Sequence, residues 1–138
     1  HMIDFELMID GHFVYGQRSD GLIISTPTGS TAYALSGGGP IMHPKLDAMV
    51  LVPLNPHTLT SRPLVVAGDS EIKIHITTEK VRPLVSCDGT EGIRLQVDDV
   101  IAIRKKPHRL HLIHPPGHDF YQACRSKLGW SSRPGDNS

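Results

Sequence analysis

Apolar and polar residues alternate with a period of two along much of the chain, which is typical of β-strands with one buried face. The first run alternates from Phe5 to Ile9, and Asp10-Gly11 is a two-residue hairpin signal before a return strand at residues 13–15. Residues 84–87 are expected to pair with residues 93–97 across an Asp88-Gly89 turn. Other strands are expected at residues 21–25, 48–52 (ended by Pro53), 64–66, 72–76, 100–103 and 110–113.

Helical signals are few. Residues 30–36 can form a short helix that the glycines and proline of residues 37–40 stop, and Asp119 can cap a helix over residues 120–128 that Gly129 closes. Eleven prolines and thirteen glycines fit a chain of short strands and frequent turns. We therefore expect a mainly β, β-sandwich-like domain over residues 3–130, with a few short helices.

Composition narrows the classes of partner. The chain has 138 residues, 38% hydrophobic and 20% charged, which suits one folded domain. Its 14 Lys and Arg balance 14 Asp and Glu, so it lacks the basic footprint of a nucleic-acid or acidic-membrane binder. No apolar run approaches the roughly 20 residues of a membrane span. We expect neither a nucleic acid nor a membrane as a partner.

The two ends of the chain and its two cysteines indicate where the folded domain lies and in which compartment. His1-Met2 is typical of a tag remnant, and residues 131–138 are small and polar, as in a flexible tail. Cys87 and Cys124 lie far apart in the sequence, and a domain of this length needs no disulfide. We expect a cytoplasmic protein.

The densest polar segment follows the expected strand at residues 21–25. It contains Ser25, Thr26, Thr28, Ser30 and Thr31, and a hydroxyl-rich turn that opens a helix can hold a nucleotide with its unpaired backbone N–H groups. It is neither a Walker P-loop, because it has no lysine, nor a G-x-S-x-G nucleophile turn. The alternative is a helix that uses these hydroxyls to cap its own first turn, and the residues alone leave both interpretations open.

Two further features, a group of four histidines and Asp88, could have a chemical role but fit a structural one better. Four histidines, His108, His111, His114 and His118, lie close together in the sequence. On a strand His108 and His114 would share one face while His111 would point to the other, and no Asp, Glu or Cys completes a compact ligand set before Asp119. Surface or partly packed histidines fit better than a zinc site, so we assign no metal ligand. Asp88 could act as a base, although a hairpin-turn role fits its Asp-Gly-Thr context better.

One long motif resembles a known family. Residues 18–33 (RSDGLIISTPTGSTAY), followed by residues 38–44 (GGPIMHP), are similar to the C-terminal domain of bacterial NAD kinases. The first motif is highly specific, and the resemblance covers roughly residues 4–130. Shorter motifs extend it: PHTL at 56–59, RPLV at 62–65, SCDG at 86–89 and KLGW at 127–130.

The resemblance implies an enzyme that phosphorylates the adenosine-ribose 2′-hydroxyl of NAD to give NADP. ATP or polyphosphate would supply the phosphate, with a divalent cation such as Mg²⁺. The family pairs an N-terminal α/β domain with a β-rich C-terminal domain and holds NAD between them. The implied partners are NAD or NADP, the protein's own N-terminal domain, and further copies in a homo-oligomer, a dimer or a tetramer.

The resemblance also implies site residues. Arg18 and Asp20 would make polar contacts to NAD, and Asn55 and Thr90 would be further NAD contacts. The residues that would line the nucleotide at the turn and helix start are Thr28, Thr31, Ala32, Tyr33 and Ser36.

Two family features are missing from the chain. There is no Gly-Gly-Asp-Gly-Thr motif, whose Asp is taken to activate the 2′-hydroxyl, and no Asn-Glu pair before the first strand. We therefore expect the NAD-binding, oligomer-forming C-terminal domain of an NAD kinase, with no catalytic residue in this chain and no kinase activity alone. The alternative is a non-catalytic β-sandwich that binds nucleotides or proteins; a lipid kinase of the same superfamily fits the motif less well.

Overall fold

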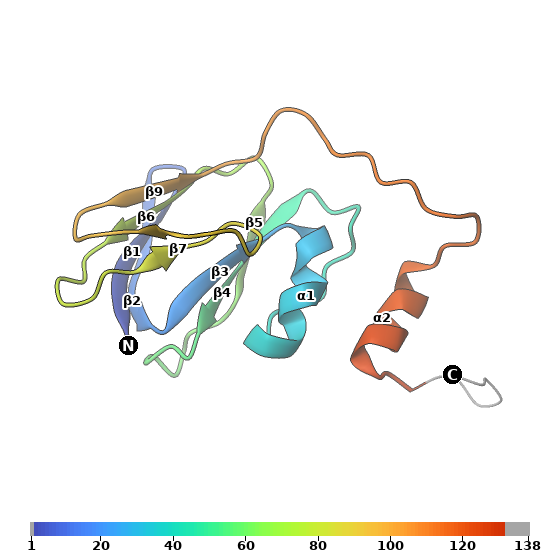
Figure 1. Ribbon diagram of the computed structural model, residues 1–138, viewed down its shortest axis with the longest axis horizontal. Helices are drawn as coiled ribbons and strands as arrows, with labels where there is room; N and C mark the ends of the chain where they lie inside the picture. The colour runs from blue at the N-terminus through green and yellow to red at the C-terminus, as the bar shows by residue number, and fades with distance from the viewer. Residues whose placement is uncertain (1, 132–138) are drawn as a thin grey trace.

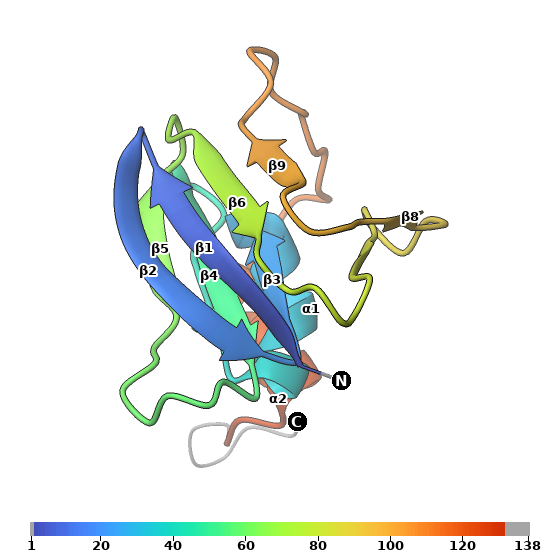
Figure 2. The same ribbon diagram turned by 90° about the vertical axis from the view of Figure 1, so that its left-hand side faces the viewer.

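The computed structural model describes residues 2–131, and for residues 33–36 it describes the backbone alone. Two antiparallel sheets pack face to face, and helix α1 covers the outer side of the second sheet (Figures 1 and 2). The first sheet has the order β2 (His12–Ser19), β1 (Ile3–Ile9), β6 (Ile72–Ile76), β9 (Val100–Ile103). The second sheet has the order β3 (Gly21–Ser25), β4 (Ala48–Leu54), β5 (Leu64–Ala67). The remaining elements are the pair β7 (Leu84–Val85) and β8 (Ile93–Arg94), α1 (Pro27–Gly37) and α2 (Phe120–Leu128).

The core lies between the two sheets, where the apolar side chains of alternating positions meet. Its buried members come from β1, β4 and β6, and each contributes about 1.5–3 kcal/mol by leaving water. They are Phe5, Leu7, Met49, Leu51, Ile72, Ile74 and Ile76. The mainly β fold expected from the alternation is confirmed.

Strand β4 is buried on both faces. Met49 and Leu51 face the first sheet, whereas Val50 and Val52 form a second cluster with Met42. This second cluster lies on the side of α1, because a Cβ added to Gly37 would lie 3.2 Å from Val52. A strand covered by a sheet on one side and by a helix on the other has no polar face, which explains its run of apolar residues.

Several expected boundaries are wrong. Helix α1 begins at Pro27 and not at residue 30, because Thr26 caps it and a proline is already preorganised for the first helical position. Strand β4 continues through Pro53, which pairs with Leu22; the β5 ladder has already ended at Leu51, so Pro53 is not required to donate on that side. The pairing of residues 84–87 with 93–97 shrinks to two residues in each strand.

The strand expected at residues 110–113 is also wrong. This segment is irregular and follows β9, and its apolar side chains are exposed, Ile113 at 96%. Alternation alone cannot form a strand without a neighbouring strand to complete its hydrogen bonds. The α2 prediction, by contrast, is confirmed, with Asp119 as its N-cap and Gly129 as its left-handed C-cap.

The expected tag remnant and tail fall mainly on His1 and residues 132–138, which lie outside the described residues. Among residues 2–131, no helix is long and apolar enough to cross a membrane.

Candidate functional site

The start of α1 is built by its own hydroxyl groups. The Thr26 hydroxyl accepts a hydrogen bond from the Gly29 N–H at 3.2 Å, and the buried Ser30 hydroxyl donates to the Pro27 carbonyl at 2.7 Å. The Ser25 hydroxyl donates to the Thr26 carbonyl, and a Cβ on Gly29 would lie 2.7 Å from that hydroxyl. Three of the hydroxyls in the turn are thus used to shape and cap the helix, so the capping interpretation holds for them.

Thr28, Thr31 and Ala32, which are expected to line the nucleotide, lie in the same first turns of α1. Thr28 and Ala32 are exposed, and Thr31 is half-buried. Tyr33 and Ser36 belong to α1, but their side chains lie outside what the structure describes. The N-terminal turn of α1 therefore faces outward, and the exposed Thr28 hydroxyl is available to a ligand or to another domain at this end of the molecule.

A second group of expected site residues gathers at the other end of β3. The Asn55 side-chain amide donates a hydrogen bond to Asp20 Oδ2 at 2.8 Å, and the Asp20 backbone N–H donates to the Leu54 carbonyl at 2.8 Å. Asn55 has a left-handed backbone (φ 46°), which turns its side chain back toward Asp20 at the end of β4. These contacts hold an exposed carboxylate in place at a sheet corner.

Arg18 belongs to the same corner. Its Nε donates to Asp4 Oδ1 at 2.6 Å and its Nη2 donates to Asp4 Oδ2 at 3.0 Å, so the two side chains form a bidentate ion pair. The hydrogen bonds from Arg18 hold the pKa of the Asp4 carboxyl below its ordinary value, so the pair is ionised at neutral pH. The carbonyl of Arg18 accepts the N–H of His57 at 3.0 Å, which ties Arg18 to the loop that carries Asn55.

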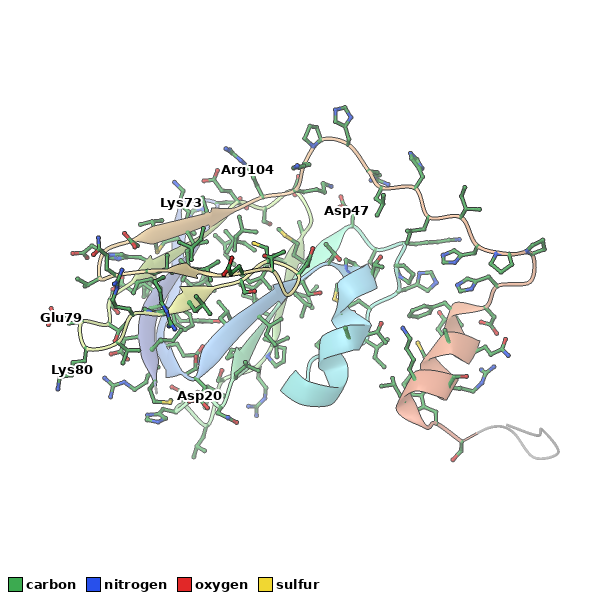
Figure 3. The ribbon with its side chains drawn as sticks, in the orientation of Figure 1. Asp20, Asp47, Lys73, Glu79, Lys80 and Arg104 are labelled. Carbon is green, nitrogen blue, oxygen red and sulfur yellow. The ribbon has the colours of Figure 1, made fainter. Side chains whose placement is uncertain are left out.

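The two groups are separated by the length of β3. Five strand residues span about 16 Å, and α1 then runs back along the strand, so the helix start and the Asp20 corner lie at opposite ends of it. Figure 3 shows this separation, with Asp20 at one end and Asp47, next to the start of β4, at the other. The structure therefore brings together Arg18, Asp20 and Asn55, and holds Thr28, Thr31 and Ala32 apart from them.

Thr90 lies in the turn between β7 and β8. Its hydroxyl donates to the Cys87 carbonyl at 2.6 Å, and Asp88 and Gly89 have the positive φ values of a tight hairpin turn (50° and 74°). The hydrogen bond of Thr90 is typical of a turn residue, and the left-handed backbone of Asp88 is typical of a hairpin turn. An NAD contact of Thr90 stays a prediction.

The histidine-rich segment does not form a strand. The rings of His114 and His118 stack at 3.9 Å between their centroids, which is a local contact within one loop. Across the described part of the chain, no three His, Cys, Asp or Glu side chains lie where they could hold a metal ion. Cys87 is exposed and Cys124 is buried, and both are free.

Asp4 is the member of the corner that the sequence analysis missed. It carries no motif signal, and a regular two-residue hairpin would place it opposite Gln17 and not opposite Arg18. The only available signal was its position on the first strand of a hairpin whose second strand carries Arg18.

A family model described as the ATP-NAD kinase C-terminal domain matches residues 1–115. The chain belongs to this family. The NAD kinase of Alcanivorax borkumensis is 99% identical over 138 residues, which are 100% of this chain and 46% of that relative. The NAD kinase of Acinetobacter baylyi is 66% identical over 131 residues, which are 95% of this chain and 43% of that relative. The chain thus spans about half the length of the curated relatives it matches.

Solved structures agree with this assignment. Yeast NADH kinase complexed with NADH superposes with a TM-score of 0.84 at 29% identity, over 96% of this chain and 41% of that one. An NAD kinase from Archaeoglobus fulgidus in complex with ATP superposes with a TM-score of 0.67 at 37% identity, over 77% of this chain and 40% of that one. The family predicted from the motif at residues 18–33 is therefore confirmed for this NAD kinase C-terminal domain.

Proposed function

We propose that this chain is the NAD-binding half of a longer NAD kinase that transfers a phosphoryl group from ATP to the adenosine-ribose 2′-hydroxyl of NAD. The observation that carries the proposal is the motif of residues 18–33, which occupies one continuous unit: the end of β2, strand β3, the Thr26 cap and the first turns of α1. The unit ends in two polar positions about one strand length apart. An extended dinucleotide carries polar groups at both of its ends and suits such a pair.

In this proposal the two positions have different chemistry. Arg18 and Asp20, with Asn55 beside them, offer a cation, a carboxylate and an amide to the hydroxyl, amide and phosphate groups of NAD. The helix start offers Thr28, with Thr31, Ala32, Tyr33 and Ser36 lining the same ligand. Thr90 would reach NAD from the β7–β8 turn.

The catalytic groups of the proposed reaction lie outside this chain. It lacks the Gly-Gly-Asp-Gly-Thr motif, and its described residues bring no group of metal ligands together, so the residues that would hold Mg²⁺ are proposed to lie outside this chain. Polyphosphate remains an alternative donor to ATP. This chain's part is to bind and orient NAD, because positioning is a major share of phosphoryl-transfer catalysis.

We also propose the partners that complete the site. Leu110, Leu112 and Ile113 are exposed at 85%, 54% and 96% within one short segment, and such a run of exposed apolar side chains supports a surface that another domain or subunit covers. The protein's own N-terminal half and further copies in a dimer or tetramer are the proposed partners. Both free cysteines fit a reducing, cytoplasmic setting.

A coupled assay for NADP tests the proposal in two steps. The chain alone should form no NADP, whereas a full-length relative should; NADP formation by the chain alone would contradict the division of labour. In the full-length enzyme, Asp20→Ala and Tyr33→Ala should each weaken NAD binding. The matched control is Asp69→Ala, an exposed carboxylate in the turn between β5 and β6.

A second measurement separates this proposal from a pure interaction module. NAD should raise the melting temperature of the full-length protein, because a ligand selective for the native state stabilises it. Unchanged NAD affinity in both Asp20→Ala and Tyr33→Ala would count against the site. No thermal shift even at millimolar NAD would favour the interaction module.

A further inference from the structure

The hairpin that joins β1 and β2 contains a bulge. Asp10 and Gly11 form its two-residue turn, and Met8 pairs with Phe13 as a regular hairpin requires. One pair further on, Leu7 faces Tyr15, so Val14 is an extra residue in β2 without a partner in β1.

This one extra residue decides which face Arg18 occupies. In an unbroken register Arg18 would lie opposite Ile3, on the same face as the core residues Phe5 and Leu7, and Asp4 would lie opposite Gln17. The observed register places Arg18 opposite Asp4 on the outer face of the sheet. Tyr15 takes the inner face instead, with its ring in edge contact with Phe5 at 6.4 Å between centroids.

Asp4 is firmly held where the bulge places it. Its backbone carbonyl accepts the N–H groups of Thr77 and Thr78, at 3.0 and 3.2 Å, just after β6 ends. Its two carboxylate oxygens accept Nε and Nη2 of Arg18. Two hydrogen bonds along its Nε–Nη2 edge orient the guanidinium, and among the described residues Nη1 on the opposite side makes no hydrogen bond, so it can face a ligand.

We infer that Asp4 is a positioning residue, which fixes the Arg18 guanidinium in the direction from which it contacts NAD. The inference rests on the proposed function, since it needs Arg18 to contact NAD. Asp4 itself touches no substrate in this account, and its effect passes entirely through Arg18.

The test uses a full-length relative and four substitutions at the matching positions: Asp4→Asn, Asp4→Glu, Arg18→Ala and Glu6→Gln. Arg18→Ala should raise the KM for NAD by about tenfold or more, because it removes a charged hydrogen-bond donor. Asp4→Asn should raise it about two- to fivefold, the range for losing one exposed ion pair, with kcat and the KM for ATP nearly unchanged. Asp4→Glu should recover most of the loss. Glu6→Gln, two residues on along the same strand and face, should behave as wild type.

The double variant Asp4→Asn with Arg18→Ala decides between positioning and a general structural role. If Asp4 acts through Arg18, the double variant matches Arg18→Ala alone. Additive effects of the two substitutions on the KM for NAD would overturn the inference. A fall in both kcat and melting temperature in Asp4→Asn would also overturn it. A wild-type KM in Asp4→Asn beside a raised KM in Arg18→Ala would overturn it while the proposed NAD contact stands. A wild-type KM in Arg18→Ala would instead remove the contact itself, and the inference with it.

Discussion

The paired sheets and the C-terminal arm, which we define as residues 104–131, are held in different ways. In the sheets, Leu51 and Ile72 are completely buried between strands from distant parts of the sequence. In the arm, Leu110 and Ile113 are exposed, and α2 stands apart from the sheets at the end of an extended segment (Figure 1).

The arm nevertheless has its own local contacts. The ring of Phe120 lies 5.0 Å from that of His43. The buried Cys124 lines an open pocket of about 320 Å³ together with both of these residues and with Ile41 and Trp130. Lys105 makes an ion pair of 2.7 Å with Asp47 at the start of the arm. The comparison shows that the sheets are stabilised by their own burial, whereas the arm has only a small contact of its own.

The largest expected difference comes from removing one leucine in each region. Leu51→Ala leaves a cavity between the sheets and should lower the free energy of unfolding by about 2–5 kcal/mol. Leu110→Ala removes an exposed side chain and should change it by less than about 0.5 kcal/mol. Urea denaturation of the 138-residue chain measures both. Equal losses would mean that the arm is packed as tightly as the core.

Adding one methyl group tests how closely α1's exit segment packs on β4. A Cβ on Gly39 would lie 2.8 Å from Val52, so Gly39→Ala should cost about 1–3 kcal/mol through overpacking. Combining Gly39→Ala with Val52→Ala should cost less than the sum of the two single changes, since the second creates room for the first. Additive losses in chemical denaturation would show that the two residues do not compete for space.

The two helix caps should respond differently to the same substitution. Thr26→Ala and Asp119→Ala each remove an N-cap worth about 0.5–2 kcal/mol to its helix. Because α1 packs on β4, Thr26→Ala should lower the global unfolding free energy, whereas Asp119→Ala should fray α2 locally. Hydrogen exchange resolves the two cases: faster exchange confined to residues 120–128 is expected for Asp119→Ala, and a global change in that variant would contradict the comparison.

The smallest expected effect is a pH dependence within the first sheet. The Asp98 hydrogen bond at 2.9 Å, assisted by Glu6, raises the pKa of His75 above 6.5. The ion pair therefore adds its full stability below about pH 6.5, and this stability is lost as the pH rises through the raised folded-state pKa. The gain is less than about 1 kcal/mol for so exposed a pair. His75→Gln should remove the difference in urea midpoint between pH 5.5 and 8 (~2.5 pH units); a persistent difference would assign it to another group.

The sequence predicted what local pattern and turn chemistry determine. The Asp10-Gly11 turn, the β1–β2 hairpin and both caps of α2 follow from residues close together in the chain. The strand expected at residues 110–113 failed because alternation does not reveal whether a partner strand exists. Helix α1 starts earlier than expected because a proline fits the first helical position, where a backbone N–H would have no partner in the helix.

In the candidate site, too, local motifs were predictable from the sequence and pairing between distant residues was not. The motif of residues 18–33 identified the family, and three of the residues expected to contact NAD, Arg18, Asp20 and Asn55, lie at one corner. Asp4 was missed because its pairing with Arg18 depends on the bulge at Val14. A bulge shifts every later pair by one residue, and no residue in the hairpin signals it by type.

Hydrogen exchange on a full-length relative, with and without NAD, tests the central claim most directly. If the unit of residues 18–33 holds the dinucleotide, NAD should slow exchange at the first turn of α1 and at residues 55–57, while β6, buried in the first sheet, should not change. Slower exchange elsewhere, with none at the start of α1 or beside Asp20, would contradict the account.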